Sequence, residues 1–474
     1  MSTNPRVHTR RRASSVSQAL SAIPLNNAPA YESRVPVTAT QNAPAEQTDS
    51  NPSLQLNGSA DSFTAAEVVA DEARAAQLRR RRPGNDEKPV TEAVAALPGD
   101  KKLPVKRNID PFDDARYKSD GLWQDLRTGK WMLIPSSSLP ILVLPILLYI
   151  NHEYILTNPN IPLPDVFRQI VPITTRNPWT PLLFLSGFDG RDEAGTSFYK
   201  RSWLDLLFIA YHIVFFSFVR QSITLYILRP LVKRLGIPPA KFERFTEQGY
   251  AFLYFGFFGP LGMYVMHGLP IWWYNTSAFW TTFPVLRMTG LLKAYYLLQG
   301  SYWCQQAIIL AAGVEKPRKD FKELIAHHII TLWLIGWSYM LTLTYIGVAV
   351  YVTMDVSDIF LALAKCVNYV SEDASAPFFA FFVVVWTYMR HYLNLKILYS
   401  VWTEFDLVPE WARTTTFEPW KETGLLAWWL QPVIFASIFF LQLINLFWYF
   451  LILRILFRAL FSKSLSDERS DEDE

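Results

Sequence analysis

The sequence FKELIAHHIITLWLIGWSYMLTLTY (residues 321–345), followed by YVTMDVSDIFLALAKCVNYV (residues 351–370), decides the fold. Each stretch is long and apolar enough to cross a lipid bilayer as a helix. Ionisable side chains are costly at membrane depth, and those that are present there generally mark a functional site. The pattern therefore predicts a helical membrane protein with its chemistry within these two helices. The ionisable residues concerned are His327, His328, Asp355 and Asp358.

Working outward from this pair, we expect about eight apolar segments to cross the membrane, at roughly 20 residues per crossing. They lie near residues 131–151, 203–228, 250–271, 288–312, 325–342, 344–370, 377–402 and 425–458. A turn between residues 341 and 347 would bring the histidines and aspartates to similar depths, about 15 to 20 Å from the turn at about 1.5 Å of rise per residue. The predicted fold class is an all-α integral membrane protein, a polytopic helical bundle.

The two ends of the chain differ in composition from this apolar body. All 17 tryptophans lie at or beyond Trp123, whereas residues 1–110 are rich in small, polar and charged residues. Such a segment has too little apolar surface to offset its ordering entropy, so we expect a disordered tail. Its start has no apolar core, so no cleavable signal peptide is expected. Residues 461–474 form a short acidic tail.

Basic residues predict the orientation of the bundle. They are concentrated in residues 229–244 and 316–322, which alternate with connections poor in Lys and Arg. The positive-inside rule places both of these connections in the cytosol, and an even number of crossings then places both termini there. Residues 111–240 are expected to form an interfacial segment and the first two crossings. The apolar sequence PWTPLLFLSG (residues 178–187) is too short to cross and is expected to be re-entrant.

The cysteines and histidines argue against a metal centre. The only two cysteines, Cys304 and Cys366, lie inside predicted spans, so neither a disulfide framework nor a thiolate metal site is expected. Consecutive helical residues point about 100° apart, so His327 and His328 cannot easily share one ion. We expect one of them to face the site and the other to hold the helix in place, with no metal and no cofactor.

The second of the two helices carries a polar stripe. Lys365 and Tyr369 follow Asp358 by seven and eleven residues, which places them with Asp355 along one helical face. At this depth such a stripe must face a cavity or partner side chains rather than lipid. The candidates to face it from the seventh predicted span are Arg390 and His391.

Two alternatives to a catalytic interpretation stay open. An internal ion-pair network, Asp358 with Lys365 or Asp355 with Arg390, would only fix the packing of the helices. A transporter would also place ionisable groups near the midplane, although the sequence shows no inverted repeat of broken helices. Both alternatives use the same residues, so the residues alone do not choose among them.

Three segments carry a resemblance to a known family. They are YYLLQGSYWCQQAIIL (residues 295–310), EKPRKDFKELIAHHIITLW (residues 315–333) and MDVSDIFLALAKCVNY (residues 354–369). They resemble the longevity-assurance signature of ceramide synthases within the TLC domain. The long N-terminal tail and the acidic C-terminal tail resemble the fungal branch. The resemblance implies a six-helix TLC core in residues 241–460. It also implies an endoplasmic-reticulum membrane enzyme that N-acylates a sphingoid long-chain base with fatty acyl-CoA, or alternatively a non-catalytic TLC-domain protein for lipid binding or trafficking.

The implied reaction gives these residues roles. An amine attacks a thioester only when it is unprotonated, and a neutral imidazole can accept its proton near neutral pH. This base is assigned to His327 or His328, with Asp355 or Asp358 orienting it as in a catalytic triad. A two-step route, in which a histidine first takes the acyl group, stays open. The supporting polar residues are Lys365, Tyr369, Arg390 and His391.

The resemblance also implies partners. Fatty acyl-CoA, a sphingoid base and membrane lipids are expected, and nucleic acid is not. Arg and Lys suit phosphate groups, so the basic segment before the histidines is a candidate contact for coenzyme A, although the positive-inside rule alone also explains it. A homodimer, or a heteromer with a second synthase and a small single-span regulatory subunit, is left open. The candidate coenzyme A contacts are Lys316, Arg318, Lys319 and Lys322.

The tails carry predicted phosphorylation sites. Ser15 follows an arginine run, which suits a basophilic kinase, whereas Ser464 and Ser470 each precede an acidic residue by three positions. A phosphate would add about two negative charges at each site. Because a flexible tail cannot easily reshape a buried site, the expected effect is on partners or trafficking.

Overall fold

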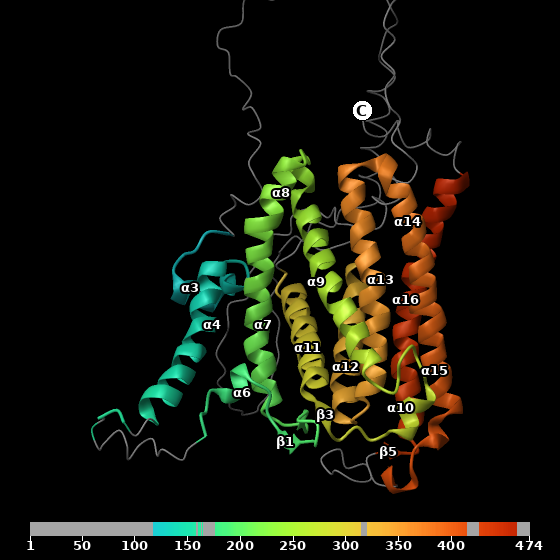
Figure 1. Cartoon of the computed structure of the whole chain (residues 1–474). Helices are drawn as coiled ribbons and strands as arrows, with labels where there is room; N and C mark the ends of the chain where they lie inside the picture. The colour runs from blue at the N-terminus through green and yellow to red at the C-terminus, as the bar shows by residue number, and fades with distance from the viewer. Residues whose placement is uncertain are drawn as a thin grey trace, which may run out of the picture. The chain divides into compact units, whose positions relative to one another are not determined.

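The computed structural model describes residues 117–157, 160–162, 164, 176–313, 320–414 and 426–461. Within these ranges the chain is a bundle of long helices with two small sheets (Figure 1). Several predictions fall outside them and are not tested by the structure. These concern the whole N-terminal tail (residues 1–110), residues 462–474, the serines Ser15, Ser464 and Ser470, and the basic residues Lys316, Arg318 and Lys319.

Each predicted crossing coincides with a helical segment in the described part of the chain. These segments are α4 (Pro135–Ile150) with η4 (Asn151–Leu156), α7 (Asp205–Ser222) with η5 (Ile223–Leu228) and α8 (Arg229–Arg234), α9 (Phe242–His267), α11 (Gly290–Ala311), α12 (Phe321–Met340), α13 (Thr344–Val370), α14 (Glu372–Trp386) with η7 (Thr387–Leu393) and α15 (Asn394–Thr403), and α16 (Leu430–Phe461). Four are long and apolar enough to span a membrane by length and composition, namely Pro135–Leu156, Asp205–Arg234, Thr344–Val370 and Leu430–Arg458. The chain is therefore a multi-pass helical membrane protein, and the number eight stays a prediction.

The predicted turn between the histidines and the aspartates is present. Helix α12 ends at Met340 and α13 begins at Thr344, with Thr342 in a left-handed conformation (φ 58°) between them. In Figure 1 this turn lies at the end of the bundle that carries the strands, whereas α8 and the junction of α13 with α14 lie at the opposite end. The histidines and aspartates thus lie at comparable distances from this turn along the axis of the bundle, as the expected turn requires.

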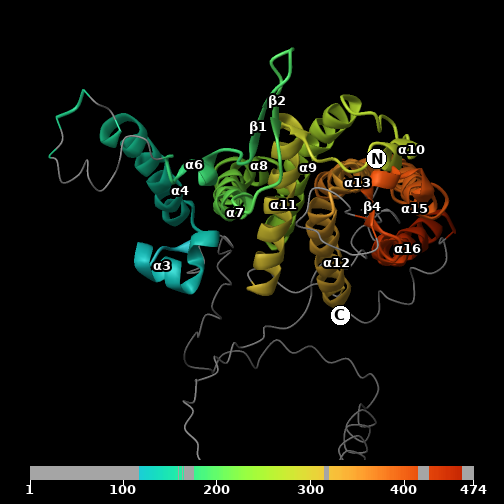
Figure 2. The same cartoon turned by 90° about the horizontal axis from the view of Figure 1, so that it is seen from below.

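Six helical segments form a closed ring of contacts, which matches the expected six-helix core. Helix α9 packs on α13 and α11, α11 on α12, α12 on α16, α16 on α15, and α13 on α14. Figure 2 views the bundle from the strand-bearing end and shows α4 on the far side of α7 from α13 and α16. Helix α4 packs on α7, and α7 packs on α11, so these first two segments lie outside the ring.

The segment before α4 is anchored by one buried carboxylate. It consists of α3 (Leu122–Thr128) and the short η3 (Lys130–Met132). Asp125 is fully buried and accepts hydrogen bonds from the hydroxyls of Ser119 and Ser137, each at 2.5 Å. These hydroxyl donors hold the pKa of Asp125 below its ordinary value because they stabilise the charged form. The contact ties α3 to the first turn of α4.

Small strands, which the all-α expectation did not include, form two sheets. Strands β1 (Phe188–Arg191), β2 (Ser197–Tyr199) and β3 (Met288–Thr289) pair antiparallel in that order, and β4 (Arg413–Thr414) pairs parallel with β5 (Leu426–Ala427). The segment expected to be re-entrant contains α6 (Thr180–Leu183) and leads into β1. Lys293 of α11 donates to the carbonyl oxygens of Ser186 and Lys200, both at 2.7 Å, and so fixes this hairpin to the bundle.

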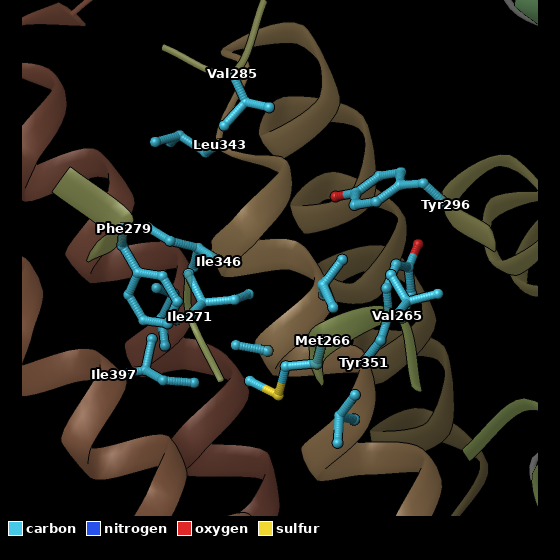
Figure 3. Close-up of a cluster of buried hydrophobic side chains, with 14 of the residues drawn as sticks. Val265, Met266, Ile271, Phe279, Val285, Tyr296, Leu343, Ile346, Tyr351 and Ile397 are labelled. Carbon is cyan, nitrogen blue, oxygen red and sulfur yellow. The ribbon is translucent and has the colours of Figure 1, made fainter. Parts of the chain in front are cut away.

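The core of the ring is apolar and aromatic toward the strand-bearing end. Figure 3 shows Met266 of α9, Tyr296 of α11 and Ile346 and Tyr351 of α13 converging there. Met266 and Tyr296 are almost completely buried. Gly347 permits the close approach of α13 to α11, because a Cβ at this position would collide with the hydroxyl of Tyr296. Helix α10 (Ser277–Thr281) adds Phe279 and Trp280 to the same core.

Candidate active site

The two histidines line one polar cavity inside the ring of helices. The cavity has a volume of about 250 Å³ and takes its walls from α9, α11, α12, α13, α14 with η7, and α16, with Arg220 of α7 added from outside the ring. His327 and His328 lie in the second turn of α12. The structure brings them together with residues from two other predicted spans. The ionisable residues that share the cavity with them include Asp358, Lys365, Arg390 and Asp320.

Arg390 makes the central ion pair of this cavity. Its Nη2 lies 2.6 Å from Oδ1 of Asp358, its Nε donates to Ser357 at 2.7 Å, and its Nη1 donates to Asn445 at 3.1 Å. The guanidinium also stacks over Trp386, 4.1 Å from the ring centroid. Arg390 stands on η7, a π-helical segment, and such segments often occur at functional sites.

This pairing differs from the one predicted for Arg390. The expected pairs were Asp358 with Lys365 or Asp355 with Arg390, whereas the structure pairs Arg390 with Asp358. Asp355 is fully buried and accepts a hydrogen bond from Gln299, whose Oε1 in turn accepts from Tyr254 at 2.8 Å. Residues three apart on a helix differ by about 60° in direction, which is enough to give the two aspartates different neighbours.

The expected hydrogen bond between a histidine ring N–H and an aspartate carboxylate is therefore not formed in the described structure. Asp355 lies between α9, α11 and α13 and lines neither the polar cavity nor the apolar channel described below. Asp358 reaches the cavity, but Arg390 holds its carboxylate. In the described structure Asp358 thus borders the cavity and holds Arg390, and it does not hydrogen-bond an imidazole.

The histidines themselves have different surroundings. Nδ1 of His328 lies 2.9 Å from the carbonyl oxygen of Leu324, one turn earlier on the same helix. His327 is packed edge-to-face between Trp303 at 5.6 Å and Trp448 at 5.2 Å between ring centroids, and its buried Nδ1 has no hydrogen-bond partner. His328 is thus held by its own helix, whereas His327 retains an unused ring nitrogen. Both histidines line the cavity, so the expected division, with only one of them facing the site, is not evident from the lining.

A narrower apolar channel adjoins the polar cavity. It has a volume of about 80 Å³ and lies between α11, α12, α13 and α16. Trp303 and His327 line both spaces, so the two meet at these residues. The channel reaches the turn between α12 and α13, where Leu341 and Leu343 belong to its wall. An amphiphile could therefore place a polar group in the cavity and an alkyl chain in the channel.

Some predicted site residues lie elsewhere. Tyr369 packs against Phe245 at 6.3 Å between ring centroids, in a cluster outside the cavity. His391 turns toward α16, with its Nδ1 2.8 Å from Nε2 of Gln442. Lys322 is exposed and does not line the cavity. Cys304 and Cys366 are free thiols, and no cluster of three potential metal ligands occurs among the residues that the structure describes.

Sequence reasoning missed several residues at the site. Trp303 lies in the quoted family motif but has no titratable group, so a search for ionisable residues passed over it. Thr331 follows His327 by four residues, a spacing that places both on one helical face, and this was the available signal. Asp320 and Trp448 come together only through packing, with Nε1 of Trp448 donating to Asp320 at 3.3 Å.

The fold and site identify the class as a TLC-domain membrane protein, since residues 244–454 match the TLC domain family. The chain is 46% identical over 284 residues to the sphingosine N-acyltransferase lac1 of Schizosaccharomyces pombe, covering 58% of this chain and 71% of that protein. It is 41% identical over 280 residues to the ceramide synthase LAG1 of Saccharomyces cerevisiae, covering 59% and 67% respectively. The human ceramide synthase 5 is 28% identical over 240 residues. The chain belongs to the ceramide synthase, or sphingosine N-acyltransferase, family.

Proposed function

We propose that this chain is a ceramide synthase, an acyltransferase that moves a fatty acyl group from acyl-CoA to the amino group of a sphingoid base. The observation that carries this proposal is the meeting of a polar, histidine-lined cavity with an apolar channel at His327. Both substrates are amphiphiles, and this arrangement holds a reactive polar group beside a catalytic base with its chain in an apolar space. The fungal relatives named above support the same activity.

In the proposed reaction, His327 acts as the general base. The nitrogen lone pair of the amine attacks the thioester carbon, the carbonyl π electrons move to oxygen, and His327 accepts the proton from nitrogen. The tetrahedral intermediate then reforms the carbonyl, the carbon–sulfur bond breaks, and the leaving thiolate takes the proton from imidazolium. The products are an N-acylated base, dihydroceramide or phytoceramide, and free coenzyme A. A route through an acyl-imidazole at His327 uses the same position.

The ion pair of Arg390 and Asp358 supports this chemistry by fixing the walls of the cavity. Its hydrogen bonds join η7 to Ser357 of α13 and to Asn445 of α16. Replacing either partner would leave a buried charge without its counter-charge, which is strongly destabilising. We therefore assign Arg390 and Asp358 as positioning residues. In this role they also fix the packing of the helices, as the alternative of an internal ion-pair network required.

The placement of the substrates follows from the two spaces. We propose that the acyl chain occupies the apolar channel, while the coenzyme A nucleotide stays at the membrane face where α12 begins. Lys316, Arg318, Lys319 and Lys322 remain candidates for its phosphates. An endoplasmic-reticulum location with both termini in the cytosol, assembly as a homodimer or heteromer, and phosphorylation at Ser15, Ser464 and Ser470 remain part of the proposal.

One assay tests the function directly. The detergent-purified full chain is supplied with fatty acyl-CoA of several chain lengths and dihydrosphingosine, and N-acylated product is measured by mass spectrometry. We expect product formation that depends on both substrates. Absence of product with every chain length, with candidate partner subunits present, would contradict the proposal and favour a non-catalytic lipid-binding or trafficking protein.

A further inference from the structure

Two unpaired hydrogen-bond donors line the apolar channel that His327 also borders. Nε1 of Trp303 and Oγ1 of Thr331 are buried and have no hydrogen-bond partner in the described structure. Buried polar groups in native proteins are nearly always paired, because an unmade hydrogen bond is costly in an apolar environment. Two such donors beside a candidate catalytic base therefore call for an explanation.

Their placement relates both donors to His327. Trp303, on α11, packs edge-to-face against His327 at 5.6 Å and against His328 at 5.9 Å between ring centroids. Thr331 lies four residues after His327 on α12, on the same helical face and about 6 Å further along the axis. Trp303 lines both spaces, whereas Thr331 lines only the channel. The two donors thus belong to different helices and flank the junction.

The chemistry of acyl transfer places a specific group at this junction. With the acyl chain in the channel and coenzyme A toward the cavity, the thioester carbonyl lies next to His327. Attack on its carbon moves an electron pair to the carbonyl oxygen, and the negative charge must be stabilised until the carbon–sulfur bond breaks. Donors fixed in advance at this position stabilise the transition state strongly, because they need no reorganisation when the charge develops.

We propose that Trp303 and Thr331 form the oxyanion hole of this enzyme, donating Nε1–H and Oγ1–H to the carbonyl oxygen of the acyl thioester. The inference rests on the proposed function, because it requires an acyl thioester as substrate. It holds for direct attack by the amine and for a route through acyl-imidazole, since both pass through a tetrahedral intermediate with the same oxyanion. It assigns catalytic roles to two residues without titratable groups.

The chain offers a matched control for each donor. Trp280 and Thr344 are completely buried, and their Nε1 and Oγ1 atoms also have no hydrogen-bond partner. Neither residue lines the cavity or the channel. Removing a donor from these positions causes a comparable change in a buried side chain without touching the junction. A general effect on folding would therefore appear equally in the controls.

The test measures kcat and KM of the purified full chain with saturating dihydrosphingosine and varied acyl-CoA. We expect Trp303→Phe and Thr331→Val each to lower kcat by about 10² to 10³, the usual loss for one oxyanion donor, with a much smaller change in KM. Thr331→Ser retains the hydroxyl and should stay within a few-fold of the wild type. Trp280→Phe and Thr344→Val should keep wild-type kcat.

A second measurement separates chemistry from binding and folding. The Kd for acyl-CoA should be unchanged in Thr331→Val, because valine keeps the shape of threonine and the ground-state carbonyl carries little charge. Normal kcat in both Trp303→Phe and Thr331→Val, equal losses in the two controls, or failure of Thr331→Ser to retain activity would each overturn the oxyanion hole. These results require an active wild type, whereas an inactive wild type would instead contradict the proposed function.

Discussion

Two buried ion pairs in this molecule have similar composition but different surroundings. Lys293 and Asp205 pair at 2.8 Å, and Lys293 is completely buried. The Lys293 ammonium also donates to the carbonyl oxygens of Ser186 and Lys200, so three oxygen atoms lie within 2.8 Å of its nitrogen. Asp205 accepts in addition from the hydroxyl of Tyr339 at 2.7 Å. This pair joins the hairpin, α7, α11 and α12.

The pair of Arg390 and Asp358 is comparably short but borders a space with unused polar atoms. Three buried polar atoms at this cavity or the adjoining channel have no hydrogen-bond partner in the described structure, namely Nδ1 of His327, Nε1 of Trp303 and Oγ1 of Thr331. A cavity of about 220 Å³ also borders Asp205, so an empty space beside a buried charge does not by itself define a site. Single buried polar atoms without a hydrogen-bond partner also occur elsewhere in the described part of the chain, at Trp280 and Thr344. What distinguishes the candidate reactive region is that His327, Trp303 and Thr331, each with an unpaired polar atom, line one channel.

The largest expected effect is at His327. Replacing it with alanine removes the general base or nucleophile, so we expect kcat for ceramide formation to fall by at least about 10². His328→Ala should also abolish activity, because it removes the neighbouring imidazole that anchors the site. Product is measured by mass spectrometry and protein by immunoblot of membranes. Near-normal turnover in both variants would break the assignment of the cavity as the reactive region.

The second expected effect is on stability alone. Lys293→Met leaves the Asp205 carboxylate buried without its counter-charge, so we expect a loss of about 3 to 5 kcal/mol in the free energy of unfolding. The kcat of the remaining folded enzyme should match the wild type, because this pair is remote from the cavity. Thermal unfolding in detergent and kcat per folded molecule are measured together.

A partial rescue sharpens this prediction. The double variant with Lys293→Met and Asp205→Leu removes both charges, and replacing a whole buried pair by apolar residues is often nearly neutral. It should recover much of the lost thermal stability. A loss of kcat with unchanged stability in Lys293→Met would place this pair in the catalytic machinery and contradict the comparison.

A smaller effect is expected at the far end of the apolar channel. A Cβ at Gly347 would collide with the hydroxyl of Tyr296, and both residues line the channel. Gly347→Ala should lower kcat/KM for the longest acyl-CoA by about tenfold, within the range of overpacking penalties, and shorter chains should be less affected. Gly336→Ala is the control, because its added Cβ meets nothing within 4 Å. Equal losses for all chain lengths would argue against the channel as the acyl site.

The last prediction concerns orientation and should leave activity unchanged. In a variant with Cys304 and Cys366 replaced by alanine, a cysteine at Lys233 should react with an impermeant maleimide from the cytosolic side of sealed microsomes. A cysteine at Asn275 should not, because the positive-inside rule places it at the other face. Labelling is measured by gel shift. Reaction at Asn275 alone would show that the orientation is the opposite of the predicted one, with the polar cavity nearer the lumenal side.

Much of the helical architecture could be predicted because apolar length and helical period are local properties of the sequence. The turn expected between residues 341 and 347 coincides with the end of α12 at Met340 and the start of α13 at Thr344. Arg390 could be proposed to face the polar stripe because it lies midway through an apolar span, where a charge needs a partner. The β-hairpin was missed because its attachment depends on Lys293, about 100 residues away, a distance no local pattern conveys.

By itself, therefore, the sequence determined the apolar helices, the approximate depth of His327 and Asp358, and the family. Only the tertiary structure decided that Arg390 pairs with Asp358 and Gln299 with Asp355. It also decided that Trp303 and Thr331 line one channel with His327. Helical spacing fixes the direction of a side chain relative to its own helix. The neighbour that it meets depends on how α9, α11, α14 and α16 pack around that helix, which is a property of the whole ring.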